Sequence, residues 1–298
     1  MRLALSAGAG RDFFKALAYM LAAMSRPFLK MNGLGNDFVV VEARSAPFRP
    51  AADEARAIAD RTNGIGCDQL ISIEPSTRAD AFMRIWNADG GEVEACGNAT
   101  RCVGWLLMRA SGKDRASIET GAGLLSATRA DDGLITVDMG KPGLEWIQIP
   151  LAEEMDTRNI ELQVGPIDAP ILHTPGCVSM GNPHVVFFVP DVETAPVREV
   201  GPMIEHHLLF PEQTNVGFAQ IVGRDRIRLR VWERGVGETR ACGTGACAAL
   251  VAAARRNLTG RKAVVELAGG ELIIEWRESD GHVLMTGPVA VEFTGTLP

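Results

Sequence analysis

Two cysteines of this chain, Cys96 and Cys242, stand in the same tripeptide, Ala-Cys-Gly, and the two copies lie 146 residues apart. Inverting a carbon centre needs a base on one face and an acid on the other, and a thiolate opposite a thiol supplies both. A single Ala-Cys-Gly is as readily a packing feature at the start of a helix. Two copies in the same local context favour chemistry, and they fit a cofactor-independent amino-acid racemase or epimerase.

Each cysteine is expected at the start of a helix. After Cys96, apolar residues recur at helical spacing at Val103, Leu106, Leu107 and Ala110. After Cys242, they recur at the same spacing at Ala246, Ala249, Leu250 and Ala253. Asn98 and Thr244, which follow the two Cys-Gly pairs, are N-cap residue types. The positive end of a helix lowers the pKa of a thiol, and its free N–H groups bind anions. We therefore expect thiolate character at both cysteines and a substrate carboxylate between the two helix starts.

The same offset relates other parts of the chain. It superimposes Gly35-Asn36 on Gly181-Asn182, Gln69 on Asn215, Arg84 on Arg230, Trp86 on Trp232 and Gly91-Glu92 on Gly237-Glu238. One offset that joins several separated segments indicates a duplicated domain. The chemistry is then expected where the two copies face each other.

The elements that must position these residues are mostly short strands. Strands are expected at 38–41, 84–86, 134–139, 185–189, 226–232 and 271–276, and further helices at 53–61 and 199–207. This order predicts an α+β fold and not the regular βαβ alternation of a doubly wound sheet. The turn-rich segment 140–143 marks a boundary, so we predict a first domain over 25–142 and a second over 143–286.

Residues 1–24 precede the first motif-bearing strand, which begins at Phe28. They hold a few basic residues and the short apolar run 16–23, a pattern that a weak targeting segment would share. No clear small-residue cleavage site follows that run. We therefore favour the interpretation that 1–24 is an extension outside the folded domains and that translation starts near Met24.

Composition excludes several classes of protein. The net charge of −7 over 298 residues argues against a sequence-independent nucleic-acid binder, and no apolar stretch reaches the roughly 18 residues of a membrane span. The six cysteines are too sparse for a disulfide scaffold and form no Cys-x-x-Cys pair, so no metal site is expected. Neither a phosphate-binding loop nor a pyridoxal-type lysine is identifiable, so we expect no cofactor.

A series of ordered motifs resembles the diaminopimelate epimerase family from about Phe28 to the C-terminus. They are Met31-Asn32-Gly33-Leu34-Gly35-Asn36-Asp37-Phe38, Gly64-Ile65-Gly66-Cys67-Asp68-Gln69-Leu70, Asn87-Ala88-Asp89-Gly90, Cys96-Gly97-Asn98, Met180-Gly181-Asn182-Pro183-His184, Asn215-Val216, Glu233-Arg234-Gly235-Val236-Gly237-Glu238-Thr239 and Ala241-Cys242-Gly243-Thr244-Gly245-Ala246. The resemblance implies two pseudo-symmetric domains, each a curved, mostly antiparallel sheet around a central helix, with the active site in the cleft between them. It also implies that the last strand, within 287–298, returns to the first domain.

The activity implied by the resemblance is conversion of LL-2,6-diaminopimelate to the meso isomer, for lysine and peptidoglycan synthesis and without pyridoxal phosphate. By similarity, Cys96 and Cys242 are the acid and the base. The substrate would be held by Asn36, Gln69, Asn87, Gly97, Asn98, Asn182, Asn215, Glu233, Arg234, Gly243 and Thr244, with His184 in a supporting role. Amide and guanidinium groups match the distal carboxylate and ammonium of a two-headed substrate.

Taken without the family, these polar residues have plainer explanations. The asparagines are turn formers, Glu233-Arg234 is a surface ion pair, and His184 is a core histidine. Family members often have Gly-Ala where this chain has Ala99-Thr100, within the first turn of a predicted helix. Cys67, two residues before Gln69, replaces a commoner apolar residue and places a spare thiol near the site. Cys102, Cys177 and Cys247 are expected to be buried small hydrophobes.

Three other functions stay open at this point. A proline or hydroxyproline racemase of the same superfamily would take a small cyclic substrate, which the distal polar set argues against. A non-catalytic amino-acid-binding protein would not need either cysteine, and a redox protein would join them in a disulfide. We expect a small-molecule amino-acid substrate as the partner, neither nucleic acid nor membrane, a cytoplasmic location, and we allow for a homodimer.

Overall fold

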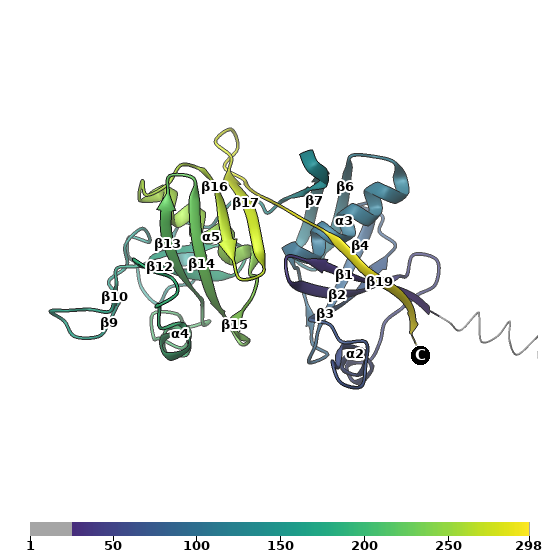
Figure 1. Ribbon diagram of the computed structural model, residues 1–298, viewed down its shortest axis with the longest axis horizontal. Helices are drawn as coiled ribbons and strands as arrows, with labels where there is room; N and C mark the ends of the chain where they lie inside the picture. The colour runs from purple at the N-terminus through teal and green to yellow at the C-terminus, as the bar shows by residue number, and fades with distance from the viewer. Residues whose placement is uncertain (1–25, 298) are drawn as a thin grey trace, which may run out of the picture.

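The computed structural model describes residues 26–297, so the expected extension at 1–24 lies outside the described residues. The chain folds into two halves that lie side by side, each a curved sheet that surrounds one long helix (Figure 1). Seventeen strands form one hydrogen-bonded network, and a separate pair of two-residue strands projects from the second half. The predicted α+β class is confirmed.

The first half is built around helix α3. Its elements are β1 (Arg26–Gly33), β2 (Asn36–Glu42), α2 (Ala52–Ala59), β3 (Gln69–Glu74), β4 (Ala81–Asn87), β5 (Glu92–Val93), α3 (Gly97–Ser111), β6 (Arg115–Thr120), β7 (Gly123–Arg129) and β8 (Ile135–Asp138), with a 3-10 turn at Asp131–Gly133. α3 packs against β1, β6, β7 and β8. Gly112 ends the helix in the left-handed conformation, with φ of 71°, a geometry that glycine adopts without a steric penalty.

The second half repeats this design around helix α5. A 3-10 turn (Trp146–Gln148) and the short strands β9 (Gln163–Val164) and β10 (Leu172–His173) lead into it. Its elements are β11 (Gly176–Ser179), β12 (Pro183–Phe188), α4 (Val197–Glu205), β13 (Asn215–Gly223), β14 (Arg226–Glu233), β15 (Gly237–Thr239), α5 (Gly243–Arg255), β16 (Lys262–Leu267), β17 (Gly270–Trp276) and β18 (Val283–Gly287). Residues on all sides of α5 are apolar, which suits a helix that is enclosed by the sheet and α3.

The strand register confirms the duplication. β2 and β3 pair in parallel with Phe38 opposite Gln69, and β12 and β13 pair in parallel with His184 opposite Asn215. Each residue of the second pair lies 146 positions after its counterpart in the first pair, which is the offset of the two Ala-Cys-Gly tripeptides. The shorter helices correspond as well, although α2 and α4 end two residues before the predicted 53–61 and 199–207. The spacing of the sequence therefore reports a repeated arrangement in space.

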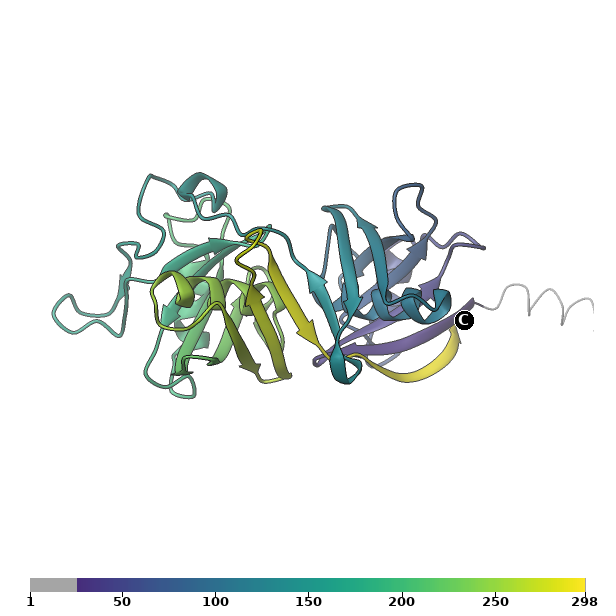
Figure 2. The same cartoon turned by 90° about the horizontal axis from the view of Figure 1, so that it is seen from above.

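Two connections tie the halves together. β18 pairs antiparallel with β8, so the two sheets meet along one edge. The chain then crosses over, and β19 (Ala290–Leu297) pairs antiparallel with β1 of the first half (Figure 2). One cluster of buried apolar side chains runs through both halves and includes the inner faces of α3 and α5. The ends of the two central helices are consequently held by a common core.

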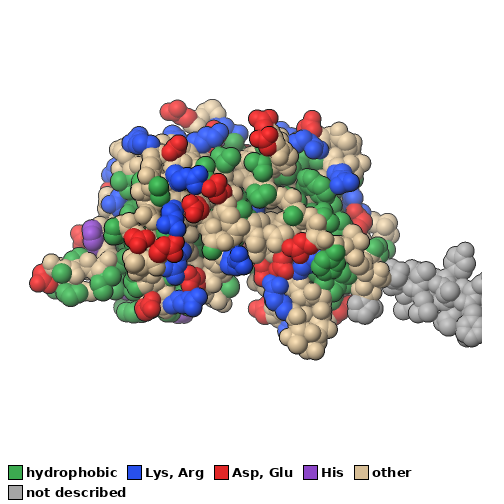
Figure 3. All heavy atoms as spheres, viewed as in Figure 1, with side chains coloured by type: hydrophobic (Ala, Val, Ile, Leu, Met, Phe, Trp, Pro, Cys, Tyr) green, Lys and Arg blue, Asp and Glu red, His purple; other side chains and the backbone are tan. Residues whose placement is uncertain are grey.

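The surface has the mixed character expected of the composition. Acidic and basic side chains alternate over the face shown in Figure 3, and neither sign forms a continuous field there. Within residues 26–297 no helix has the length and apolar character needed to span a membrane.

Candidate active site

The two repeated cysteines occupy equivalent places at the starts of the central helices. Cys96 is the N-cap residue of α3 and Cys242 is the N-cap residue of α5, both with extended backbone. The prediction that Asn98 and Thr244 are the caps is therefore wrong: each helix begins two residues earlier. The backbone N–H of Gly245 donates to the sulfur of Cys242 at 3.3 Å, so this thiol itself satisfies one free N–H of the first turn.

The starts of α3 and α5 lie next to each other. A Cβ atom placed on Gly243 would lie 3.3 Å from Oδ1 of Asn98 and 2.8 Å from the sulfur of Met285. A Cβ placed on Gly97 would lie 2.7 Å from Cε of the same methionine. The glycine after each cysteine thus leaves room for the Met285 side chain between the two helix N-termini, which converge on one place.

On the side of Cys96, a chain of hydrogen bonds begins at a carboxylate. Asp68 accepts from Nδ2 of Asn36 at 2.7 Å and from Arg61 at 2.6 Å. The sulfur of Cys96 lies 3.9 Å from Oδ1 of the same asparagine. Asp68 therefore fixes which atom of the Asn36 amide faces the thiol. The sequence did not predict a role for Asp68, although this residue stands beside Gln69 in one of the family motifs.

Gln69 and Asn87 come together at the ends of β3 and β4. Nε2 of Gln69 donates to Oδ1 of Asn87 at 3.0 Å. Oε1 of Gln69 is buried and has no hydrogen-bond partner among the described residues, and the same holds for Oδ1 of Asn98. Buried acceptors without partners are unusual, and these two lie among the residues predicted to bind substrate. They are suited to accept hydrogen bonds from a ligand ammonium.

On the side of Cys242, the neighbours are a carboxyl group and hydroxyl groups. The sulfur lies 3.6 Å from Oγ1 of Thr244, and burial together with the neighbouring Glu233 carboxyl group raises the pKa of the thiol. Thr239, which sequence reasoning missed, donates to Glu233 and fixes its carboxyl group. Only the tertiary structure identifies this threonine, because it lies on β15 and has no counterpart among the predicted residues.

His184 reaches the site through Asn182. Its Nε2 atom lies 3.0 Å from Oδ1 of Asn182, and Nδ2 of that asparagine lies 3.5 Å from Oγ1 of Thr244. Burial and, to a lesser extent, the nearby Arg234 charge lower the pKa of His184 to about 3. The histidine is thus a neutral positioning group, not a proton donor at ordinary pH.

Asn215 and Arg234 form a support at the ends of β13 and β14. Asn215 is buried; its Nδ2 donates to the carbonyl of Pro183 at 2.8 Å, and its Oδ1 accepts from the backbone N–H of Arg234 at 3.0 Å. The exposed guanidinium of Arg234 donates to the carbonyl of Glu212 at 2.8 Å. Asn215 thus holds the loop that follows β14, and Arg234, the first residue of that loop, is anchored in place.

The expectation of thiolates is wrong for the protein without substrate. Burial raises the pKa of Cys96 to about 11, although the backbone N–H groups of Ala99 and Asn98 oppose the shift. Burial and the neighbouring Glu233 charge raise the pKa of Cys242 well above its usual value. Burial also raises the pKa of the Glu233 carboxyl group. The loss of hydration thus outweighs the helix N-termini at both thiols.

The other four cysteines are not part of this arrangement. Cys102, Cys177 and Cys247 are fully buried, as predicted. Cys67 is also buried, in the cluster of apolar side chains beneath α2, and burial raises its pKa to about 11. It is a core residue and not a spare thiol in the site.

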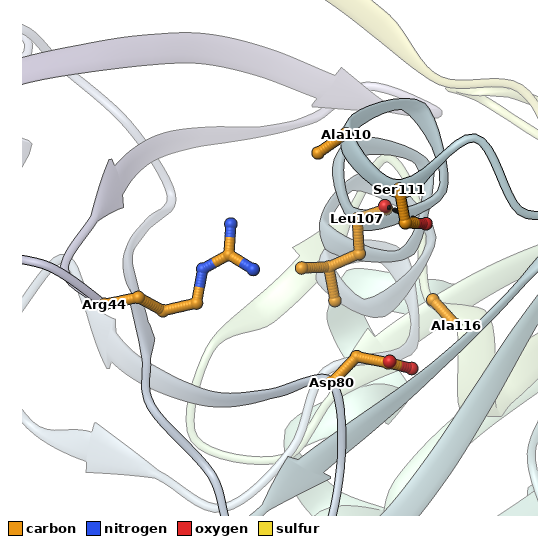
Figure 4. Close-up of a pocket in the computed structure, with 6 residues that line it drawn as sticks. All are labelled: Arg44, Asp80, Leu107, Ala110, Ser111 and Ala116. Carbon is orange, nitrogen blue, oxygen red and sulfur yellow. Dashed lines mark hydrogen bonds between the residues drawn. The ribbon is translucent and has the colours of Figure 1, made fainter.

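A hollow of about 190 Å³ lies beside the C-terminal end of α3, whereas Cys96 stands at the other end of that helix (Figure 4). It is lined by Arg44, Asp80, Leu107, Ala110, Ser111 and Ala116. Figure 4 shows Arg44 and Asp80 at its rim, but Asp80 accepts from Ser117 at 2.7 Å and Arg44 donates to Glu42 at 2.7 Å. Its charged groups are thus already paired within the protein, and no predicted site residue lines it.

Comparisons with known proteins agree with the repeat and with the fold. The family model described as diaminopimelate epimerase matches residues 28–145 and 176–292. The diaminopimelate epimerase of Phenylobacterium zucineum is 68% identical over 279 residues, which cover 94% of this chain and 100% of that protein. The enzyme of the same description from a Caulobacter species is 64% identical and covers 92% and 98%.

Solved structures at low identity share the fold. A hydroxyproline epimerase from Agrobacterium vitis superimposes with a TM-score of 0.65 at 17% identity, over 92% of this chain and 91% of that one. A protein of the PhzF family of phenazine biosynthesis from Bacillus anthracis gives a TM-score of 0.64 at 17% identity, over 92% and 99%.

Proposed function

The chain belongs to the diaminopimelate epimerase family, and from that premise we propose that it interconverts LL- and meso-diaminopimelate with Cys96 and Cys242 acting on opposite faces of the α-carbon. The observation that supports this mechanism best is the convergence of two helix starts, each capped by one of the repeated cysteines. Chemistry that inverts a centre needs such a pair, and a duplicated domain supplies it.

The α-carboxylate is proposed to bind between the two helix starts. The first N–H groups of a helix have no partners within the helix, and those of Gly97-Asn98 and Gly243-Thr244 lie next to each other here. Hydrogen bonds from these groups favour the dianionic carboxylate that develops when the α-proton leaves. The substrate carboxylate thereby places its α-carbon between the thiols.

Proton transfer requires one thiol to ionise first. On the second side, the Glu233 carboxyl group neighbours Cys242 and is suited to receive the thiol proton. The transfer is uphill in the protein without substrate, because the pKa of a thiol lies above that of a carboxyl group and burial raises the pKa of Cys242 further. A bound α-ammonium brings a positive charge beside the thiol, which favours the thiolate. The resulting thiolate removes the α-proton, and the opposite thiol delivers a proton to the other face.

The distal amino-acid head is proposed to bind at the polar rim. Gln69 and Asn87 stand at the ends of the neighbouring strands β3 and β4 in the first half, and Oε1 of Gln69 has a free acceptor position among the described groups. Asn215 stands at the equivalent end of β13 in the second half, and Arg234, anchored beside it, is suited to a carboxylate. This set favours a substrate with a second charged head over proline or hydroxyproline.

Incubation with LL-diaminopimelate in deuterium oxide tests this function. We expect conversion to the meso isomer with one deuterium at the inverted α-carbon. Exchange with proline or hydroxyproline and none with diaminopimelate would overturn the substrate. Unchanged ligand affinity in both cysteine variants, with no exchange in the native protein, would indicate a binding protein. Dithiol-dependent electron transfer without deuterium incorporation would indicate a redox protein.

We also propose that the enzyme works in the cytoplasm. All six cysteines are free thiols in the structure, a state that a reducing compartment maintains. A homodimer stays a prediction, which size-exclusion chromatography with light scattering tests directly.

A further inference from the structure

One charged side chain at the junction of the two halves has no partner. Arg101 lies in the second turn of α3 and is 0% exposed. Its Nε, Nη1 and Nη2 atoms make no hydrogen bond to any group in residues 26–297. A buried guanidinium is normally paired, because removing its hydration shell is costly. Such a group is retained in a core only where something compensates its charge.

The surroundings of this guanidinium are backbone and thiols. It is wedged between Gly33 and Gly287, where Cβ atoms would lie 3.4 Å from Nη2 and 3.3 Å from Nε. Gly33 ends β1, just before the turn that carries Asn36, and Gly287 ends β18, where the chain crosses between the halves. A side chain at Gly287 would be tight against Nε and one at Gly33 would touch Nη2, so the guanidinium is closely packed between the two strand ends.

The titratable groups that face Arg101 are all thiols. They are Cys96 and Cys102 on its own helix and Cys247 on α5. No carboxylate among the described residues faces it. Of the three thiols, Cys102 and Cys247 are fully buried, whereas Cys96 is only partly buried and opens to the site. The anion that Arg101 can stabilise is therefore one that forms at Cys96 or binds beside it.

The duplication placed this cation on one side only. The position equivalent to Arg101 in the second half is Cys247, an uncharged residue. Conversely, the position equivalent to Glu233 in the first half is Asn87. Cys96 therefore has a buried cation behind it, whose charge opposes that of Glu233, which, in addition to burial, raises the pKa of this thiol from the second half. In addition to burial, Glu233 also raises the pKa of Cys242, where no such cation acts among the described residues.

We propose that Arg101 is a positioning residue that acts through its charge. It is the buried cation that stabilises the Cys96 thiolate and the substrate α-carboxylate bound at the helix starts. This assignment rests on the proposed two-thiol function. A charge acts over several ångströms where little water screens it, so no direct hydrogen bond to the sulfur is required. Arginine suits this place because it keeps its proton even when buried.

Alkylation of individual thiols tests the assignment without using activity. Cys96 is alkylated with iodoacetamide in a Cys242→Ser background, and the rate is followed against pH with the modified residue identified by mass spectrometry. Arg101→Met is expected to raise the midpoint of that profile by about one pH unit, since removal of a nearby cation disfavours a thiolate. Arg101→Lys keeps the charge and is expected to stay within about 0.3 of a pH unit.

Two controls separate charge from structure. Arg109→Gln removes a cation from an exposed position of the same helix and should leave the midpoint unchanged. Alkylation of Cys242 in a Cys96→Ser background should shift by less than half as much in Arg101→Met. The epimerisation rate of Arg101→Met should fall about tenfold, in proportion to the lost thiolate.

An unmoved Cys96 midpoint in folded Arg101→Met overturns the proposal. If that variant does not fold, Arg101→Lys decides, because a midpoint raised by a full unit despite the retained charge overturns it equally. Failure of the native protein to epimerise diaminopimelate would overturn the proposed function. The alkylation profiles would still test whether Arg101 stabilises the Cys96 thiolate, because they do not depend on activity.

Discussion

The two cysteine sites have the same backbone and different surroundings. Cys96 and Cys242 are the N-cap residues of equivalent helices. From equivalent turns, Asn36 faces the sulfur of Cys96, and Asn182 reaches the hydroxyl of Thr244 two residues after Cys242. Around this shared frame the polar groups differ. Asp68 and Arg61 hold Asn36, whereas neutral His184 holds Asn182. Duplication preserved the geometry, and divergence changed the charge.

This difference has a chemical meaning. A racemase interconverts mirror-image isomers and can therefore use two identical halves. LL- and meso-diaminopimelate are diastereomers, so the two isomers place different surroundings against the two thiols. Glu233 beside Cys242 and Arg101 behind Cys96 give the two thiols distinct ways to change their charge. We expect variants to separate the two sites according to these neighbours.

The largest effect is expected from removal of either thiol. Cys96→Ala and Cys242→Ala should each lower the epimerisation rate by roughly a thousandfold, because each proton transfer loses its acid or base. The rate is measured by conversion of LL-diaminopimelate to the meso isomer. Cys177→Ala serves as a control, since this thiol is fully buried in a separate apolar cluster of the second half. Equal loss in the control would show that the cysteine variants act through the fold.

A smaller loss is expected when the second site is made like the first. Glu233→Gln replaces the carboxyl group by an amide, as at the equivalent Asn87, and should lower the rate roughly a hundredfold because Cys242 loses its proton acceptor. Glu278→Gln, at an exposed position, is the matched control. A rate within a factor of two of the native one would remove Glu233 from the mechanism.

The thiols should also differ in their reactivity without substrate. Cys96 is partly exposed, and Cys242 is 4% exposed beside a carboxyl group, so iodoacetamide should modify Cys96 at least about ten times faster. The pKa of Cys96 is raised to about 11. Its thiolate is therefore the minor form below that pH, and its alkylation rate should rise about tenfold per pH unit up to about pH 11. A plateau near pH 7 would contradict the buried-thiol state.

The smallest effect is expected at His184, whose equivalent in the first half is Phe38. His184→Phe removes the hydrogen bond to Asn182 without removing a proton carrier, so the rate should fall by less than about tenfold. The acidic limb of the pH–rate profile should not move, because the pKa of His184 is lowered to about 3 and the ring is neutral throughout the working range. His206→Phe, at an exposed site, is the control. A shift of the acidic limb would assign His184 a proton-transfer role.

Much of the fold follows from local patterns. The strands around Phe38 and Val185, the helix after each cysteine and the stop at Gly112 lie where hydrophobic spacing and turn residues placed them. The helix caps were misassigned because asparagine and threonine prefer that position, yet here a cysteine backbone occupies it. Residue preference is an average, and the close approach of two helix starts overrides it.

The sequence by itself determined the pairing of Cys96 with Cys242, because a duplication leaves one constant offset along the chain. Only the tertiary structure decided the charge of those thiols. The helix start favours a thiolate, but the surrounding core encloses Cys242 and leaves Cys96 only partly exposed, and this loss of hydration depends on residues far apart in sequence. The same packing isolates the guanidinium of Arg101. Spacing along the chain fixes which groups recur, and burial in the folded protein fixes what those groups can do.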